Sequence, residues 1–502
     1  MVFSSLEFIY FFMPPVLVGF LVLRHMNWER GIIWWLIATS LLFYGWWNPI
    51  YLPLLLGSVL VNYTLHRVLL QTRDKAVLVT GIVFNLGLIA YFKYADFFIA
   101  NANALGGLEI PLVEIALPLA ISFFTFQQIS FLYDTYVGRV ESSDFARYLL
   151  FVVFFPQLIA GPIVMQKETV PQFKMKVFKS SLFLNLSVGA TLFAIGLFKK
   201  IVLADGIAPY ANSVFDLAET VQGVPMEAAW IGALAYTFQL YFDFSGYCDM
   251  ALGIARMFGI KLPVNFNSPY KARNITDFWR RWHITLSHFL RDYLYIPLGG
   301  SRHGPFRRYV NLAATMLLGG LWHGAGWTFV VWGGLHGAYL VINHAWDGMK
   351  KAGHVPALLP PLPARVLAQT LTMLAVVVAW VFFRAESFGG AIAVLRGMAG
   401  MPGPFEAKDW ASVLGASQTV WAAFVLLAGI VFLLPNAIEF TRNYKPVLRL
   451  KSILGSMSVR ASEFPVWRPS GVWATAIGGL ALVAVIQLYR LEDLTEFIYF
   501  NF

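Results

Sequence analysis

The segment 311–337 reads NLAATMLLGGLWHGAGWTFVVWGGLHG and places His323 inside an apolar run that extends from Leu312 to Leu340. A membrane helix is expected in such a run, and an ionisable group at membrane depth costs several kcal/mol unless it faces a partner or a cavity. Glycines flank His323 on both sides and allow substrate or backbone to approach closely. His323 is therefore the leading candidate for a functional residue.

The composition of the whole chain is that of a membrane protein with many spans. Of its 502 residues, 58% are hydrophobic and 13% are charged, and the mean hydropathy is +0.64; soluble domains carry about 25% charged residues. The net charge of +10 indicates first cytoplasmic loops rich in Lys and Arg, and second an anionic ligand. Nucleic acid is not expected as a partner, because the basic residues are spread over many short loops. The single cysteine, Cys248, excludes an internal disulfide.

The hydrophobic runs predict an all-α fold of about 11–12 transmembrane helices, since a span needs about 20 apolar residues. The run 148–164 is interrupted by two prolines and a glycine. We expect a re-entrant segment there, which protein or water must cover. The predicted spans are 7–23, 31–47, 51–66, 76–92, 112–136, 182–198, 228–250, 309–322, 327–347, 366–383, 418–437 and 471–489.

The basic residues orient these spans. With the N-terminus outside, 30 of the 37 Lys and Arg residues fall in loops predicted to be cytoplasmic, as the positive-inside rule requires. Both termini, including Phe502, are then outside, and the long loop 255–308 is inside. We expect one integral membrane domain over residues 1–502, with a signature core at about 118–347 and C-terminal helices at about 366–490.

Within the long loop, residues 276–295 (TDFWRRWHITLSHFLRDYLY) predict an amphipathic helix. Aromatic and aliphatic residues recur at helical spacing, whereas Arg280, Arg281 and Asp292 lie mostly on other faces. Such a helix, with Trp and Tyr at the depth of the headgroups, is expected to lie at the cytoplasmic interface and to contact membrane lipids.

Three histidines are candidates for chemistry, and each has a structural alternative. The glycines around His323 predict a broken helix that presents an imidazole to a tunnel, where neutral imidazole can act as a general base; otherwise His323 is hydrogen-bonded between packed helices. His283 could instead meet lipid headgroups, and His336 could be a packing residue. No metal site is predicted, because no His-Glu-x-x-His motif or carboxylate cluster accompanies them.

The predicted span 228–250 adds two polar candidates, Gln239 and Asp243, which share a helix face with Gly246. A carboxylate inside a membrane is a functional candidate. Equally, Asp243 could pair with an arginine of the basic loop and so hold the fold together.

Two segments of the chain resemble the membrane-bound O-acyltransferase family: FWRRWHITLSHFLRDYLYIPLGG (278–300) and the segment 311–337 quoted above. The resemblance is to the bacterial branch of that family, which contains alginate O-acetyltransferase-like membrane subunits. The resemblance covers most of the chain to about residue 400. Further segments that agree with it are MVFSS (1–5), YFKYADFF (91–98), PLAISFFTFQQISFLYD (118–134), FPQLIAGPIV (155–164) and QLYFDFSGYCDMALG (239–253).

The resemblance implies a ring of tilted helices around a thin membrane region, with a tunnel that leads to the catalytic histidine. His323 matches the catalytic histidine of that family, and His283 matches its second signature histidine; Cys248 stands where a serine would be expected. The residues that we expect to line the tunnel or to bind substrate are Trp279, Trp282, Trp322, Gln239, Asp243, Arg280, Arg281 and His336.

The implied reaction is acetyl transfer in a bacterial inner membrane. Acetyl-CoA would enter from the cytoplasm as the donor, with no permanently bound cofactor. Our candidates to bind its phosphates are Arg280 and Arg281, with Lys271 and Arg273 next; alternatively, these residues only follow the positive-inside rule and meet anionic headgroups. The final acceptor would be an exported polysaccharide such as alginate, reached with a periplasmic acetyltransferase partner and the export machinery. The immediate acceptor stays open between a hydroxyl of the partner, the sugar, and His323 itself as an acyl carrier.

A different class of function also fits the residues alone. Transporters and lipid flippases build their sites from broken helices with buried polar groups. The chain has no detectable internal repeat, which counts against this alternative.

The predicted topology can be tested by cysteine labelling. Cys248→Ser gives a background without cysteine, in which Ser301→Cys places one thiol in the loop 255–308. We expect this thiol to react with a membrane-impermeant maleimide only in opened or inverted vesicles. Reaction from the periplasmic side of intact cells would show that the layout is wrong.

Overall fold

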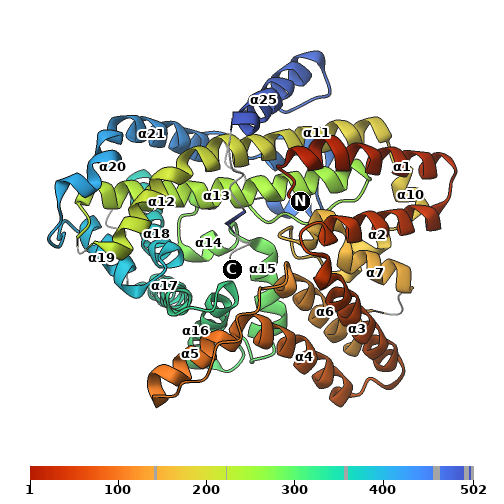
Figure 1. Cartoon of the computed structure of the whole chain (residues 1–502), viewed down its shortest axis with the longest axis horizontal. Helices are drawn as coiled ribbons and strands as arrows, with labels where there is room; N and C mark the ends of the chain where they lie inside the picture. The colour runs from red at the N-terminus through yellow and green to blue at the C-terminus, as the bar shows by residue number, and fades with distance from the viewer. Residues whose placement is uncertain (141–143, 222, 355–359, 456–463, 491–496, 499–502) are drawn as a thin grey trace.

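The structure, a computed structural model, describes all residues except 141–143, 222, 355–359, 456–463, 491–496 and 499–502 (Figure 1). Every regular element within the described residues is a helix, so the predicted all-α class is confirmed. The prediction that the chain ends outside concerns Phe502, which is not among the described residues.

The longer α-helices are α1 (Met13–His25), α2 (Glu29–Gly45), α3 (Leu52–Thr72), α4 (Lys75–Ile89), α5 (Ala95–Gly106), α6 (Ile121–Tyr136), α7 (Phe145–Val153), α11 (Leu182–Phe198), α12 (Asp205–Thr220), α13 (Met226–Met257), α16 (Gly304–His323), α17 (Trp327–Lys351), α18 (Pro361–Arg384), α19 (Phe388–Met398), α21 (Ser417–Leu433) and α25 (Gly471–Arg490). Short α-helices connect them: α8 (Phe155–Leu158), α9 (Gln166–Thr169), α10 (Met175–Phe178), α14 (Ile275–Trp279), α15 (Ile284–Leu290), α20 (Ala411–Gly415), α22 (Ala437–Phe440) and α23 (Leu450–Leu454). The π-helical segments are η1 (Glu7–Phe12), η3 (Ala90–Tyr94), η5 (Lys199–Ala204) and η7 (Arg291–Tyr295), and the 3₁₀ turns are η2 (Pro49–Tyr51), η4 (Val170–Gln172), η6 (Pro269–Lys271), η8 (Ala407–Trp410) and η9 (Arg442–Tyr444).

The long helix α13 forms the centre of the molecule. It runs across the middle of Figure 1 with α11 and α12 beside it, and almost every residue from 228 to 256 is buried. Glycines allow α11 and α13 to touch through their backbones: a Cβ atom on Gly196 would lie 2.5 Å from the Gly246 carbonyl oxygen. Small residues are the usual means of close helix contact in membranes.

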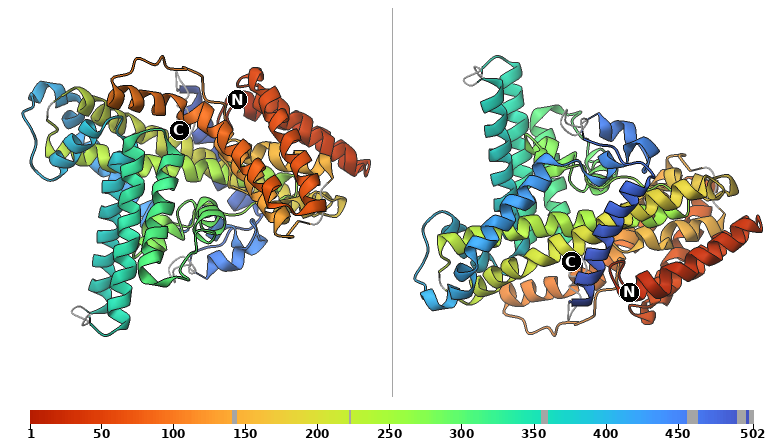
Figure 2. Two further views of the ribbon diagram at one scale, coloured as in Figure 1. Left: turned by 90° about the horizontal axis from the view of Figure 1, so that it is seen from below. Right: turned by 90° about the horizontal axis from the view of Figure 1, so that it is seen from above.

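A second close contact joins α16 to α17. A Cβ atom on Gly320 would lie 2.3 Å from the Phe329 carbonyl oxygen, and one on Gly333 would lie 2.4 Å from the Met316 carbonyl oxygen. The glycines of the 311–337 segment are therefore used for packing. Figure 2 shows α17 and α18, in teal, projecting together from the body of the molecule.

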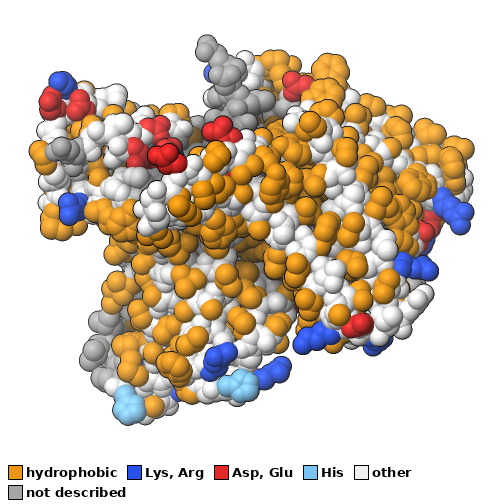
Figure 3. All heavy atoms as spheres, turned by 60° about the horizontal axis from the view of Figure 1, so that its bottom comes forward, with side chains coloured by type: hydrophobic (Ala, Val, Ile, Leu, Met, Phe, Trp, Pro, Cys, Tyr) orange, Lys and Arg blue, Asp and Glu red, His pale blue; other side chains and the backbone are white. Residues whose placement is uncertain are grey.

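The surface is largely apolar. In Figure 3 hydrophobic side chains cover most of the face shown, and many of its Lys, Arg and His side chains lie toward the lower edge. Large hydrophobic side chains such as Phe11, Leu105 and Val425 are exposed. Soluble proteins rarely expose apolar patches of this extent, so the surface is one that lipid would cover.

Six helical segments of the described chain are long and apolar enough to cross a membrane, or seven if the bent pair Ala407–Gly415 and Ser417–Leu433 is one span. This is fewer than the 11–12 that we expected. Among the predicted spans that drop out, α2 has only 17 residues. The helix α13 is long but carries Asp243, Asp249 and Arg256.

The predicted span 112–136 is wrong in its first part. The helix α6 begins only at Ile121, and residues 108–118 form no regular element. The cause is a contact from α5: the Asp96 carboxylate accepts hydrogen bonds from the backbone N–H groups of Val113 and Glu114, at 2.6 and 3.1 Å. These bonds give the backbone an alternative to the helix.

The interruption predicted in 148–164 is present. The helix α7 ends at Val153, the short α8 follows, and every residue from 148 to 164 is buried. Protein thus covers the irregular backbone, as an apolar environment demands.

The predicted interfacial helix 276–295 is wrong. The segment breaks into α14, a turn at 280–283, α15 and η7. Tertiary pairing causes the break, because the N–H of Asn267 donates to the Arg281 carbonyl and the N–H of Ile284 donates to the Asn265 carbonyl, both at 2.9 Å. His283 adopts a left-handed conformation with φ +43°.

The glycine contact between α16 and α17 yields a stability prediction. Gly320→Ala forces a methyl group onto the Phe329 carbonyl oxygen, so we expect a loss of about 1–3 kcal/mol and a lower thermal midpoint in detergent. Gly57→Ala in α3 is the matched control, because no atom lies within 4 Å of its added Cβ. Equal midpoints for the two variants would contradict the packing described here.

Candidate functional site

His323 is the last residue of α16 and lies deep inside the protein. Its side chain is only 3% exposed, and α17 begins four residues later, at Trp327, after a turn of three residues. The helix therefore breaks directly after the histidine, as the glycines predicted. A Cβ on Gly324 would lie 2.1 Å from the Phe329 ring, so the turn has no room for a larger residue.

Aromatic rings enclose the His323 imidazole. Its ring centre lies 4.9 Å from that of Trp322, 5.0 Å from Trp332 and 5.2 Å from Phe383. The ring of His283 lies 6.3 Å away. The two histidines, forty positions apart in the chain, thus belong to one site.

His283 is fully buried, so it does not meet lipid headgroups. Its Nδ1 lies 3.0 Å from Oδ1 of Asn265, which also accepts from the Thr285 hydroxyl at 3.0 Å. An amide oxygen only accepts, so His283 donates from Nδ1 and keeps Nε2 as the acceptor nitrogen. Asn265 therefore selects the tautomer. Sequence reasoning missed this residue, because a lone Asn in a loop carries no signal of its own.

His336 is connected to the site through tryptophans. The indole N–H of Trp279 donates to its Nδ1 at 3.3 Å, and the Trp332 ring lies between His336 and His323, at 4.9 and 5.0 Å. Trp279, Trp322 and His336 are thus part of the aromatic shell. Trp282 instead packs against Phe266 and Trp380 at 5.0 and 4.9 Å.

Asp243 has a different partner from the one expected. Its carboxylate lies 2.7 Å from Nζ of Lys200, which also binds Asp205 at 2.8 Å. The predicted partner was an arginine of the basic loop, but Lys200 lies in η5, which follows α11 and contacts α13. Asp243 also accepts from the backbone N–H of Ile498 at 3.2 Å. Gln239 is buried on the same helix.

A basic cleft of about 1740 Å³ adjoins the turn that follows Trp279 in the chain. Both Arg280 and Arg281 line the cleft. Arg281 forms an ion pair with Asp277 at 2.9 Å. Arg280 is exposed and makes no ion pair among the described residues. His323 is not among the lining residues. The basic residues of the cleft are Lys271, Arg273, Arg280 and Arg281 from the predicted set, and Arg308, Lys351 and Arg365 in addition; Asp277, Asp347 and Glu439 are its acids.

Comparison with known proteins identifies this architecture. The model of the membrane-bound O-acyltransferase family matches residues 97–356. The chain is 45% identical over 435 residues to a peptidoglycan O-acetyltransferase of Helicobacter pylori, and the aligned region covers 80% of each chain. It is 38% identical over 520 residues to a probable alginate O-acetylase of Pseudomonas putida, and the aligned region covers the full length of both chains.

The chain belongs to the membrane-bound O-acyltransferase family. It is a multi-pass membrane protein and an acyltransferase, as the resemblance implied, and this enzyme class replaces the alternative of a transporter or flippase. A more distant similarity, 30% identity over 256 residues, connects it to a teichoic acid D-alanyltransferase of Streptococcus thermophilus, of which it covers 62%.

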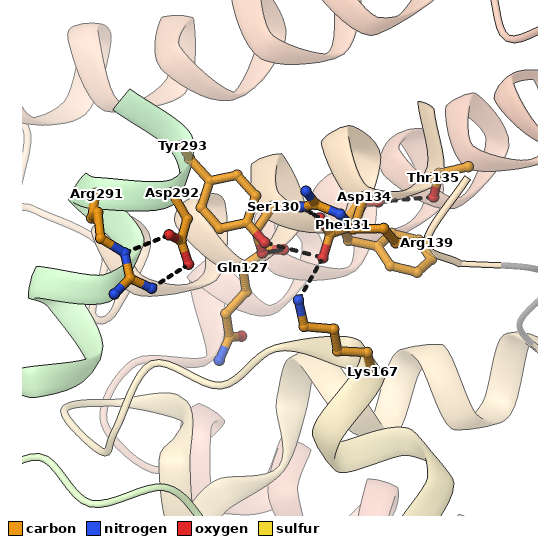
Figure 4. A network of polar contacts seen from close by, with 10 residues as sticks. All are labelled: Gln127, Ser130, Phe131, Asp134, Thr135, Arg139, Lys167, Arg291, Asp292 and Tyr293. Atoms are coloured by element: carbon orange, nitrogen blue, oxygen red, sulfur yellow. Dashed lines mark hydrogen bonds and ion pairs between the residues drawn. The ribbon is translucent and has the colours of Figure 1, made fainter. Parts of the chain in front are cut away.

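Sequence reasoning also missed a polar network that adjoins the site of this acyltransferase (Figure 4). Asp134, at the end of α6, accepts from the Tyr293 hydroxyl at 3.1 Å, forms an ion pair with Arg139 at 3.0 Å and lies 3.9 Å from Lys167. It thereby joins α6 to the broken 276–295 segment. The residue lies in FLYD (131–134), inside one of the segments that carried the resemblance, but nothing in that segment identifies its partners.

Stacked aromatic rings connect this network to Trp322. The ring of Phe126 stacks on Trp322 at 5.3 Å and on Phe289 at 4.2 Å, and Phe289 lies 5.0 Å from Tyr293. The position of Trp322 is thus set by packing that reaches the network at Asp134.

Proposed function

We propose that this acyltransferase moves an acetyl group from acetyl-CoA, bound on the cytoplasmic side, to a hydroxyl group on the way to an exported polysaccharide. The observation that carries the proposal is the burial of His323 beside His283, together with a basic cleft lined by Arg280 and Arg281, which follow Trp279 of the aromatic shell in the chain. A nucleotide thioester needs both a cationic surface for its phosphates and a dry site for the transfer.

In the proposed reaction His323 acts as the general base. It takes the proton of the acceptor hydroxyl while the hydroxyl oxygen attacks the thioester carbonyl carbon. The C–S bond then breaks, the acetyl group stays on the acceptor oxygen, and the coenzyme A thiolate takes a proton from the imidazolium. A positioned base of this kind contributes roughly 10²–10⁴-fold to the rate.

The negative charge that develops on the carbonyl oxygen needs hydrogen-bond donors. The indole N–H groups of Trp322 and Trp332 are buried and have no acceptor among the described residues, and both rings lie within 5.0 Å of the His323 ring. A buried donor without an acceptor costs about 1–3 kcal/mol. We assign these two groups as the donors that stabilise the oxyanion, since such donors act strongly in a site without water.

His283 supports this chemistry from the other side. Its Nδ1–H is fixed on Asn265, so its acceptor nitrogen has one orientation. His283 stays neutral in this scheme, because His323 alone carries the proton from the hydroxyl to the leaving thiolate; at a ring distance of 6.3 Å only one of the two imidazoles is then charged at a time.

The acceptor is proposed from the relatives. The Helicobacter protein is named for peptidoglycan and the Pseudomonas protein for alginate. Greater identity favours peptidoglycan, whereas full-length coverage favours an exopolysaccharide such as alginate. We therefore propose a polymer outside the inner membrane as the final acceptor, reached with a periplasmic acetyltransferase partner, and place both termini in the periplasm. Acetyl analysis of the cell wall and of the secreted polysaccharide in a deletion strain distinguishes the two acceptors.

The role of His323 yields a direct prediction. His323→Ala should abolish acetyl transfer in purified protein while the variant still inserts and elutes as a folded species, because it removes the base without disturbing the apolar shell. His288→Ala is the control, since His288 is half-buried outside this shell and should keep most activity. Near-normal transfer by His323→Ala would contradict the proposed mechanism.

The basic cleft yields a second prediction, on donor binding. Arg280→Ala should raise the KM for acetyl-CoA by about 10-fold or more with a small change in kcat, because phosphates far from the reacting carbon contribute mainly uniform binding. Arg302→Ala, an exposed residue that does not line the cleft, is the control. An unchanged KM in single alanine variants of Lys271, Arg273, Arg280 and Arg281 would count against a donor site here.

A further inference from the structure

The end of α16 is held by side chains from a distant part of the chain. Nζ of Lys93, in η3, donates to the Trp322 carbonyl at 2.6 Å and to the His323 carbonyl at 3.2 Å. The hydroxyl of the next residue, Tyr94, donates to the Leu321 carbonyl at 2.6 Å. Three successive carbonyls at the end of the helix thus receive donors from two adjacent residues more than two hundred positions away.

This arrangement replaces an ordinary helix cap. The last carbonyls of an α-helix have no partner inside the helix, and a glycine in the left-handed conformation often supplies the cap. Here Gly324 follows the helix in an extended conformation, with φ −163° and ψ 150°. Because a buried carbonyl without a donor costs about 1–3 kcal/mol, the donors must come from elsewhere.

A lysine that donates to these carbonyls costs free energy, because its charged group lies in an apolar segment. Lys93 lies in the segment Lys75–Gly106, which is apolar and long enough to span a membrane, and it forms no ion pair with a carboxylate among the described residues. A lysine at that depth is costly. Its contacts are with the two peptide groups on either side of the His323 Cα atom, and it lies 5.9 Å from the centre of the Trp322 ring.

We propose that Lys93 is a positioning residue for the acyl transfer: by holding both peptide groups that flank His323, it sets the direction of the imidazole and of the Trp322 indole beside it. This inference rests on the proposed role of His323 as the base. The residue lies in YFKYADFF (91–98), a segment that the function had not otherwise used. Displacement of a reacting group by about 1 Å costs about 100-fold in rate. The position of the imidazole therefore matters more than the free energy of the two hydrogen bonds from Lys93.

The test uses the full-length protein purified in detergent, with acetyl-CoA as donor. Lys93→Met keeps the length of the side chain and removes the donor, and it should lower kcat about 100-fold while the KM for acetyl-CoA stays within about two-fold. Lys93→Arg, which still donates to carbonyls, should recover most of the loss. Tyr94→Phe removes a donor one peptide further from His323 and should cost clearly less than Lys93→Met.

The control is Lys408→Met, the same substitution at an exposed position in η8, which should keep the kcat of the unchanged protein. The inference is wrong if Lys93→Met keeps kcat within about two-fold, or if its loss follows a loss of folded protein and Lys93→Arg does not restore it. If Lys93→Met fails to fold, Lys93→Leu, which also removes the donor, takes its place under the same criteria. An inactive His323→Ala beside an active Lys93→Met would overturn this inference alone, whereas an active His323→Ala would overturn the proposed function itself.

Discussion

The structure depends on how a helix can end inside an apolar protein. The helix α16 stops at His323, where the side chains of Trp322 and His323 are buried. Backbone polar groups in such surroundings must find partners within the protein. Lys93 and Tyr94 supply donors to the carbonyls, and the bare backbones of Gly320 and Gly333 let α17 return directly against α16. These contacts keep a titratable side chain buried at the end of a helix.

The second half of the site is built by a different device. The turn 280–283 is held by backbone pairing with residues 265–267, which places His283 in a left-handed conformation and directs its Nδ1 to Asn265. The same turn puts Arg280 on the basic cleft and Trp279 in the aromatic shell. The break at 280–283 therefore connects the basic cleft, which suits an anionic donor, with the histidine site. The connection runs from Trp279 to His336, from His336 to Trp332, and from Trp332 to His323.

Hydropathy and local pattern predicted those features that depend on nearby residues: the all-α class, the broken 148–164 segment and the helix break after His323. They failed where a distant contact decides the conformation. The periodicity of 276–295 is helical, but periodicity carries no information on the pairing with Asn265 and Asn267 that breaks the helix. In the same way, Asp243 was recognisable as a buried carboxylate, but its partner Lys200 and the donors Lys93 and Tyr94 were not, because only the fold brings them together.

The central claim is that an acetyl thioester held by the basic cleft presents its carbonyl carbon to His323. The most direct measurement is a structure of the protein with a non-hydrolysable acetyl-CoA analogue. The account predicts the phosphates of the analogue on Arg280 and its neighbours in the cleft, and the thioester carbonyl within about 4 Å of the His323 imidazole, close to the near-attack distance. An analogue bound with its phosphates away from this cleft, or with its carbonyl outside the aromatic shell of His323, would contradict it.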